Sequence, residues 1–222
     1  MNEEEFTKKE MIFNEIERHL LNDEKPSIFI NEFVIKNKEN SVYPFIMIGD
    51  LEDVPQEPKH HPEGNVLVHV MMVVDEAAKR RHLSKEKDIL MWSALLHDIG
   101  KKPTTKKRKN RWTSYDHDKV GAKMVLDFFK ELKSGDERLI NGVASMTRWH
   151  MQALFVIKGL PFADIKKMIE EVDVEELSLL TISDRLGRGR ITPLDKEEVV
   201  EDINLFLEKV SEVSGKKYNK IR

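Results

Sequence analysis

The chain contains no cysteine among its 222 residues. This absence excludes disulfides, thiolate metal ligands and a cysteine nucleophile, so histidine and carboxylate side chains must hold any bound metal ion. Long apolar runs are also missing, since none approaches the roughly 18 residues needed to span a bilayer. The chain begins Met1-Asn2-Glu3-Glu4-Glu5, which is acidic where a secretory or transit peptide would be basic. We therefore expect a cytoplasmic protein without a membrane segment.

The chain also has no net positive charge, since its formal net charge at pH 7 is -3. This value excludes a globally basic nucleic-acid-binding protein but leaves room for a local basic patch. Hydrophobic residues make up 40% of the chain and charged residues 35%. These proportions are typical of an ordinary domain that has an apolar core and a well-solvated surface.

Glycine and proline are scarce, with 10 and 8 residues, and no alternating apolar pattern runs for more than a few residues. Apolar residues instead recur at helical spacing, which predicts an all-α fold. The expected helices cover residues 3–22, a segment from Asn65 onward, a segment after an N-cap at Ser84 that stops at Gly100, and residues 117–133, 136–151, 161–171, 174–187 and 195–213. Pro26 is expected to end the first helical region, residues 27–60 are less regular, and the basic tail 216–222 is expected to be frayed.

Four of the eight histidines, His69, His97, His117 and His150, lie in or beside apolar helical segments. A single histidine on an apolar helix face is more often a hydrogen-bonded core residue than a metal ligand. His97, however, is followed at once by Asp98 near a helix end. There, two adjacent side chains that point about 100° apart can both reach one ion.

Asp184 is the other acid within an apolar segment, where an ionised carboxylate is costly unless it meets a cation. Together with the histidines it would suit Mn, Fe, Co, Ni, Zn or Mg. Of the remaining histidines, His19 and His82 are expected at the surface. A structural role is favoured for His60 and His61, which lie in a proline-rich loop.

The order of these residues resembles that of the HD superfamily of metal-dependent phosphohydrolases, in which a histidine is followed by a His-Asp doublet and a distant aspartate. The doublet lies here in Leu95-Leu96-His97-Asp98-Ile99-Gly100-Lys101. The resemblance implies an all-α HD-domain helical bundle with one or two divalent ions. By this analogy one ion would be held by His69, His97, Asp98 and Asp184, and a second by His117 and His150, with Asp98 bridging.

A narrower likeness covers about residues 51–190. His61-Pro62-Glu63-Gly64-Asn65 and the segment 183–189 look like the HD domain of bacterial tRNA CCA-adding enzymes, which carries phosphatase and 2′,3′-cyclic phosphodiesterase activity. The chain has no nucleotidyltransferase head motif, so we do not infer nucleotide addition. Residues 51–222 are expected to form the HD phosphohydrolase domain, and residues 1–50 an N-terminal helical cap.

The resemblance implies an enzyme that cleaves nucleotide phosphomonoesters or 2′,3′-cyclic phosphodiesters by means of metal-bound hydroxide. Lys101 would take part in catalysis with Asp98 and contact a phosphate oxygen. Arg185 and Arg188 would also contact substrate, although surface ion pairing is an equal alternative for both. Asp116 and Asp118 could orient the imidazoles. A nucleoside triphosphate or dinucleotide polyphosphate hydrolase of the same fold is the alternative enzyme.

Residues 101–111 contain seven basic side chains, and Trp112 and Tyr115 follow them. This composition is typical of a mobile lid that guides a nucleotide or an RNA 3′ end into a site, with aromatic rings available for stacking. A solvated loop that only keeps the chain soluble is the simpler alternative. A nucleic-acid-binding module with a non-catalytic metal site is the third hypothesis.

Overall fold

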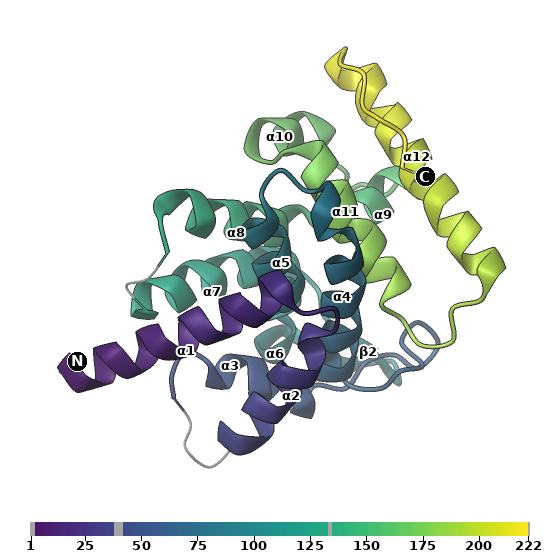
Figure 1. Cartoon of the computed structure of the whole chain (residues 1–222). Helices are drawn as coiled ribbons and strands as arrows, with labels where there is room; N and C mark the ends of the chain where they lie inside the picture. The colour runs from purple at the N-terminus through teal and green to yellow at the C-terminus, as the bar shows by residue number, and fades with distance from the viewer. Residues whose placement is uncertain (1–2, 38–41, 133–134, 222) are drawn as a thin grey trace.

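The computed structural model describes residues 3–37, 42–132 and 135–221, and it confirms the all-α prediction (Figure 1). The only strands in these residues form one two-stranded hairpin. The elements are α1 (Glu3–Asn22), α2 (Pro26–Asn37), α3 (Ile46–Gly49), η1 (Asp50–Asp53), α4 (Val66–Arg80), η2 (Arg81–Leu83), α5 (Lys87–Leu96), α6 (Lys101–Thr104), β1 (Lys106–Arg108), β2 (Arg111–Thr113), α7 (His117–Leu132), α8 (Glu137–Trp149), α9 (Gln152–Ile157), α10 (Ile165–Glu171), α11 (Val174–Leu186) and α12 (Pro193–Ser214). Three expectations reach beyond the described residues: the end of the helix at 133, the cap at 1–2 and 38–41, and the tail at 222.

The centre of the bundle is built by α4, α5, α8 and α11, and α7 packs on the outer side of α8. Helix α4 begins at Val66 and is capped by Asn65, whose side chain accepts a hydrogen bond from the backbone N–H of Val68 at 3.0 Å. The rings of Trp92 and Trp149 are fully buried. Burying a large apolar side chain contributes about 1.5–3 kcal/mol, so these helices are held mainly by packing.

The two N-terminal helices pack into the same core. The ring of Phe13 in α1 stacks on the ring of Trp92 with their centroids 5.0 Å apart. Ile30 of α2 is fully buried, and α2 packs on α4. Helix α1 has the expected bounds, but α2 lies in a region expected to be irregular. Pro26 begins α2 rather than ending the helical region, because proline is well suited to the first turn of a helix. The division of the chain near residue 50 stays a prediction.

Two further expectations are wrong. Ser84 is not the N-cap of α5, which begins only at Lys87. The Ser84 hydroxyl accepts from the backbone N–H of Glu86 at 3.0 Å and donates to the buried carboxylate of Glu176 at 2.5 Å. The tail is not frayed over its described residues, because Ile221 exchanges two hydrogen bonds with the side chain of Asn204. Both differences come from contacts between segments that are far apart in the sequence.

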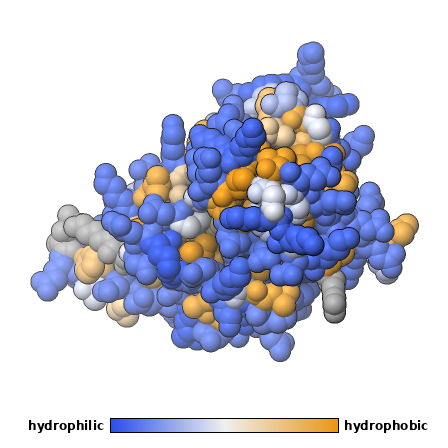
Figure 2. All heavy atoms as spheres, turned by 90° about the horizontal axis from the view of Figure 1, so that it is seen from above, coloured by the Kyte–Doolittle hydropathy of each residue, from blue (hydrophilic) through white to orange (hydrophobic). Residues whose placement is uncertain are grey.

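No helix in the described part of the chain is long and apolar enough to cross a membrane. Seen from above, hydrophilic side chains cover most of the surface, and apolar side chains gather in a band near the middle of that face (Figure 2).

Candidate metal centre

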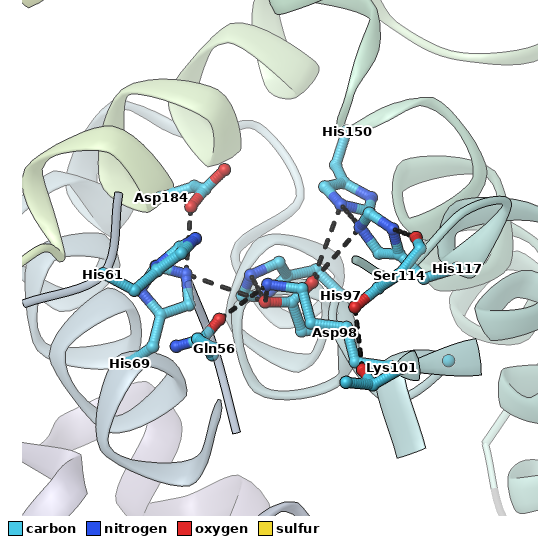
Figure 3. A network of polar contacts seen from close by, with 12 residues as sticks. Gln56, His61, His69, His97, Asp98, Lys101, Ser114, His117, His150 and Asp184 are labelled. Atoms are coloured by element: carbon cyan, nitrogen blue, oxygen red, sulfur yellow. Dashed lines mark hydrogen bonds and ion pairs between the residues drawn. The ribbon is translucent and has the colours of Figure 1, made fainter. Parts of the chain in front are cut away.

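Five helices bring six predicted ligands together in the interior (Figure 3). All six are between 1% and 8% exposed. They are His69 within α4, His97 and Asp98 directly after α5, His117 at the start of α7, His150 directly after α8, and Asp184 within α11. Most of them therefore lie at helix ends, where the chain can turn a side chain toward a shared centre. Their role as ligands remains a prediction.

The His-Asp doublet lies in a turn and not inside a helix. The helix expected to reach Gly100 ends at Leu96, and residues 97–100 form a tight turn into α6. A Cβ atom on Gly100 would lie 2.1 Å from the carbonyl oxygen of His117 and 2.5 Å from the backbone nitrogen of Gly121. Only glycine allows this backbone approach, which places the doublet beside the start of α7.

Three of the imidazoles are oriented by the backbone. The Nδ1 atoms of His97, His117 and His150 lie 3.0, 2.7 and 2.7 Å from the carbonyl oxygen three residues earlier in the chain. Because a carbonyl oxygen only accepts hydrogen bonds, each Nδ1 carries the donated proton. Each Nε2 therefore presents a lone pair to the centre, as a metal ligand requires.

The carboxylates expected to orient the imidazoles pair elsewhere. Asp116 accepts from Lys119 at 2.6 Å, and Asp118 accepts from Arg148 at 2.6 Å. That expectation is therefore wrong for both, and backbone carbonyls take the place assigned to them. Turns supply such carbonyls without any side-chain signature, so no sequence pattern could have predicted them.

His69 is oriented by a carboxylate to which the sequence pattern assigned no role. Its Nδ1 lies 3.1 Å from Glu63 Oε1 and 3.2 Å from the carbonyl oxygen of Gly187. Glu63 also accepts from His61 Nδ1 at 2.9 Å. Burial would raise the pKa of Glu63, but the hydrogen bonds from His61 and His69 outweigh it and lower that pKa. The motif His61-Pro62-Glu63-Gly64-Asn65 was the signal that could have identified this role.

Asp98 lies between two groups of ligands. Its Oδ2 atom is 3.4 Å from His97 Nε2 and 3.7 Å from His69 Nε2, whereas its Oδ1 atom is 3.4 Å from His117 Nε2 and 3.9 Å from His150 Nε2. Burial would raise the pKa of Asp98, but the Lys101 ammonium and the surrounding imidazoles hold it well below its usual range. The carboxylate is therefore ionised, with one oxygen toward each group.

The unpaired atoms of the cluster fit a divalent cation. His97 Nε2 is buried without a hydrogen-bond partner among the described residues, which costs free energy unless a cation or proton binds it, and the buried His69 Nε2 lies 3.0 Å from Asp184 Oδ1. The Nε2 lone pairs of His117 and His150 face each other at 3.1 Å. Burial, together with the rings of His117 and His97, lowers the pKa of His150 to about 3, which favours the neutral form that coordinates metal.

The donor atoms of the six predicted ligands form two compact sets. In each of them the ligand atoms lie within 4.8 Å of one another: His69, His97 and Asp184 in one, and Asp98, His117 and His150 in the other. Nitrogen and carboxylate donors without thiolates suit several first-row divalent ions and Mg.

The three predicted cationic residues have different surroundings. Lys101 is buried, with its Nζ 2.7 Å from Asp98 Oδ2 and 2.8 Å from Gln56 Oε1. Arg188 lies at the edge, 3.9 Å from Asp184 Oδ1. Arg185 pairs with Asp202 of α12 at 2.6 Å, outside the cluster. Substrate contact stays a prediction for all three.

Residues 65–189, more than half of the chain, match the family model of the HD domain. The chain therefore belongs to the HD domain family, which binds divalent metal ions and includes metal-dependent hydrolases.

Its curated relatives include proteins named multifunctional CCA protein. That of Pseudomonas syringae pv. syringae is 32% identical over 108 residues, which are 49% of this chain and 25% of the relative. That of Halorhodospira halophila is 28% identical over 150 residues, which are 64% of this chain and 34% of the relative. A third, from Nitrosospira multiformis, is 46% identical over 57 residues, which are 26% of this chain and 13% of the relative. The chain thus spans about a third or less of these relatives, and it is an HD domain related to CCA-adding enzymes.

Proposed function

We propose that this chain is a divalent-metal-dependent phosphohydrolase that cleaves nucleotide phosphomonoesters or 2′,3′-cyclic phosphodiesters. The observation that carries the proposal is the position of Asp98, whose two oxygens face two separate groups of buried imidazoles. A carboxylate in that position is suited to bridge two ions. The relation to multifunctional CCA proteins supports a nucleotide as the substrate class.

In this proposal His69, His97 and Asp184 would hold one ion, His117 and His150 would hold a second, and Asp98 would contribute a carboxylate oxygen to each. Ions bound there would supply Lewis-acid charge to the phosphoryl group. They would also lower the pKa of a bound water molecule toward neutrality. The residues of the chain contribute position and protonation state. Their backbone hydrogen bonds hold the Nε2 atoms toward the centre, and the depressed pKa of Asp98 keeps its carboxylate available at neutral pH.

In this proposal two cationic side chains bind the phosphoryl group. Lys101 Nζ lies beside Asp98, and Arg188 lies at the edge with its Nε buried and without a hydrogen-bond partner among the described residues. Phosphoryl transfer depends mainly on positioning and charge neutralisation, which these donors supply. Burial of the cluster also strengthens each electrostatic contact by excluding water.

The decisive experiment is metal analysis of the purified protein coupled to a hydrolysis panel. Phenyl phosphate, 2′,3′-cyclic AMP, nucleoside monophosphates and nucleoside triphosphates would each be tested with Mn, Ni, Co and Mg. Asp98→Ala is the test variant, and Asp127→Ala, at an exposed position on α7, is the matched control. We expect metal-dependent hydrolysis of the cyclic or monoester substrates that Asp98→Ala loses and Asp127→Ala retains.

Other outcomes would replace the proposal. Turnover of triphosphates alone would establish the alternative hydrolase. Bound metal without turnover of any substrate would favour a binding module with a non-catalytic metal. Failure to bind metal after reconstitution would contradict the proposed phosphohydrolase, the alternative hydrolase and the metal-containing binding module.

A further inference from the structure

Residues 102–116 leave the metal centre and return to it. At one end Lys101 contacts Asp98, and at the other the carbonyl of Ser114 holds the ring of His117 (Figure 3). Thr105 Oγ1 and Ser114 Oγ lie 2.7 Å apart and close the base of this excursion. Whatever binds to the segment is therefore held beside the site.

The segment that was predicted to be a basic lid contains a two-stranded hairpin. Strands β1 and β2 pair with Lys106 opposite Thr113, and Lys109 and Asn110 at the tip have φ values of 46° and 62°. Two successive residues with positive φ form the two-residue turn that suits the twist of a hairpin. The backbone N–H of Trp112 donates to Glu57 at 3.2 Å and ties the hairpin to the preceding loop. We call residues 106–113 the basic hairpin.

The cations of the basic hairpin are available for a ligand. Five of its side chains are exposed, and none of them makes an ion pair with a carboxylate among the described residues: Lys106, Lys107, Arg108, Lys109 and Arg111. Cross-strand partners point to the same face of a hairpin, so Lys106, Arg108 and Arg111 share one face. By contrast, Arg138 elsewhere on the surface is paired with Glu86 and Asp88. The charge of the hairpin is therefore uncompensated.

An exposed aromatic ring contacts this face and precedes the metal centre residue His117 in the chain. Tyr115 is 66% exposed, and the guanidinium carbon of Arg108 lies 4.8 Å from the centroid of its ring. Tyr115 precedes His117 by two residues. An exposed ring beside unpaired cations is the combination that binds single-stranded nucleic acid, since the rings stack on bases while the cations contact phosphates.

We propose that the basic hairpin and Tyr115 bind single-stranded RNA next to its 3′-terminal phosphate, so that the enzyme acts on RNA ends in preference to free nucleotides. This proposal rests on the proposed function for the reaction, but the binding of RNA by the hairpin does not depend on it. A membrane surface is disfavoured because the tip, Lys109-Asn110, has no apolar side chain to insert. An acidic peptide would use the cations but leave the stacking ring without a partner.

The test measures the binding of a fluorescein-labelled 12-nucleotide single-stranded RNA with a 3′-hydroxyl, by anisotropy at several salt concentrations. The test variant combines Lys106→Gln, Arg108→Gln and Arg111→Gln. The matched control removes the same charge at exposed positions elsewhere, with Lys166→Gln, Lys216→Gln and Lys217→Gln. We expect at least about a tenfold loss of affinity in the test variant. The slope of log K against log salt should fall by about 2, the value for three lost phosphate contacts on a single strand.

Tyr115 is tested by a conservative pair of variants. Tyr115→Ala should weaken RNA binding about tenfold, whereas Tyr115→Phe, which keeps the ring, should bind within about twofold of the wild type. If the alanine variant binds RNA as the wild type does, the stacking role is wrong.

A kinetic comparison separates this proposal from the proposed function. RNA ending in a 2′,3′-cyclic phosphate should exceed 2′,3′-cyclic AMP in kcat/KM, and the ratio should fall at least about tenfold in the hairpin variant. Equal RNA affinity in the hairpin and control variants would overturn the hairpin proposal and leave the hydrolase intact. Hairpin-dependent RNA binding without hydrolysis of either substrate would support the hairpin and reject the hydrolase.

Discussion

The metal centre and the basic hairpin are neighbours in the chain, yet their polar side chains are held in opposite ways. His117 is 8% exposed, and its ring is fixed by the carbonyl of Ser114. Arg111, only six residues earlier, is exposed and has no carboxylate partner among the described residues. Coordination needs donor atoms at fixed positions, whereas attraction of a polyanion needs only charge near the surface. Substitutions should therefore affect folding and catalysis in the first region, and binding alone in the second.

The largest effect is expected for His150→Ala, which removes a buried proposed ligand from the second set. We expect hydrolysis to fall at least about a thousandfold and the bound metal to fall from two ions to one per chain, because the nucleophile and the phosphoryl charge need both. Metal analysis and steady-state rates with His82→Ala as an exposed control would measure this. Unchanged turnover in His150→Ala would contradict the two-ion arrangement.

Gly100→Ala should break the metal centre through the backbone. The added Cβ would meet the backbone of His117 and Gly121, so we expect a loss of about 3 kcal/mol in the free energy of unfolding, together with weaker metal binding. Gly49→Ala is the control, since its Cβ would lie 3.4 Å from Val34 and its φ is -62°. Urea denaturation compares the two variants, and equal stability would show that the turn can relax.

Glu63→Gln tests the orientation of His69. The carboxylate lies 3.1 Å from His69 Nδ1 and is replaced by an amide of the same shape. Loss of such an outer partner is expected to weaken metal binding by about 10- to 100-fold. Competition with a chelator would measure this change against Glu131→Gln, an exposed control on α7. Unaltered metal affinity would assign His69 orientation to the carbonyl of Gly187 alone.

The metal-free protein should lose stability as the pH falls below about 6.5. Burial lowers the pKa of His61, His117 and His150 below the unfolded value of 6.5, so the unfolded chain binds more protons between these values. Stability therefore rises with pH through this window, by up to about 1.4 kcal/mol per pH unit for each proton. The pKa of His69 is raised, so the stability that its protonated form contributes is fully present below pH 6.5 and is lost only as the pH rises above that value.

Thermal unfolding of the chelator-treated protein between pH 5 and 7.5 would test this dependence. His150→Asn should flatten the slope and His82→Asn should not. A melting temperature that is independent of pH in the wild type would contradict the assignment of neutral buried imidazoles.

The smallest effect on catalysis is expected for two arginines at the C-terminal end of α11, and it should differ between them. Arg188→Ala should raise KM several-fold, because its buried Nε is unpaired and its guanidinium lies beside Asp184. Arg185→Ala should change KM less, because Asp202 already engages it, and should cost under about 1 kcal/mol of stability. Equal increases in KM would show that the ion pair with Asp202 opens on substrate binding.

Much of the fold follows from local signals in the sequence. The spacing of apolar residues predicted a helix from Asn65 onward, which is α4, and the same spacing predicted the bounds of α1. Helix α2 was missed because its segment Ile28-Phe29-Ile30 is apolar without a clear period. The hairpin was missed because basic residues occupy both faces of β1, which hides the alternation of a strand.

The sequence by itself determined which donor types are available and the order of the predicted ligands, because the absence of cysteine leaves only histidine and carboxylate donors and the His-Asp doublet is specific. It also determined that the doublet lies next to a basic segment. Only the tertiary structure decided that the two oxygens of Asp98 face different imidazole groups, and that backbone carbonyls and Glu63 orient the rings. These are contacts between helices that are distant in the sequence. Their geometry is set by the packing of whole side chains and the close backbone approach at Gly100, which no local pattern encodes.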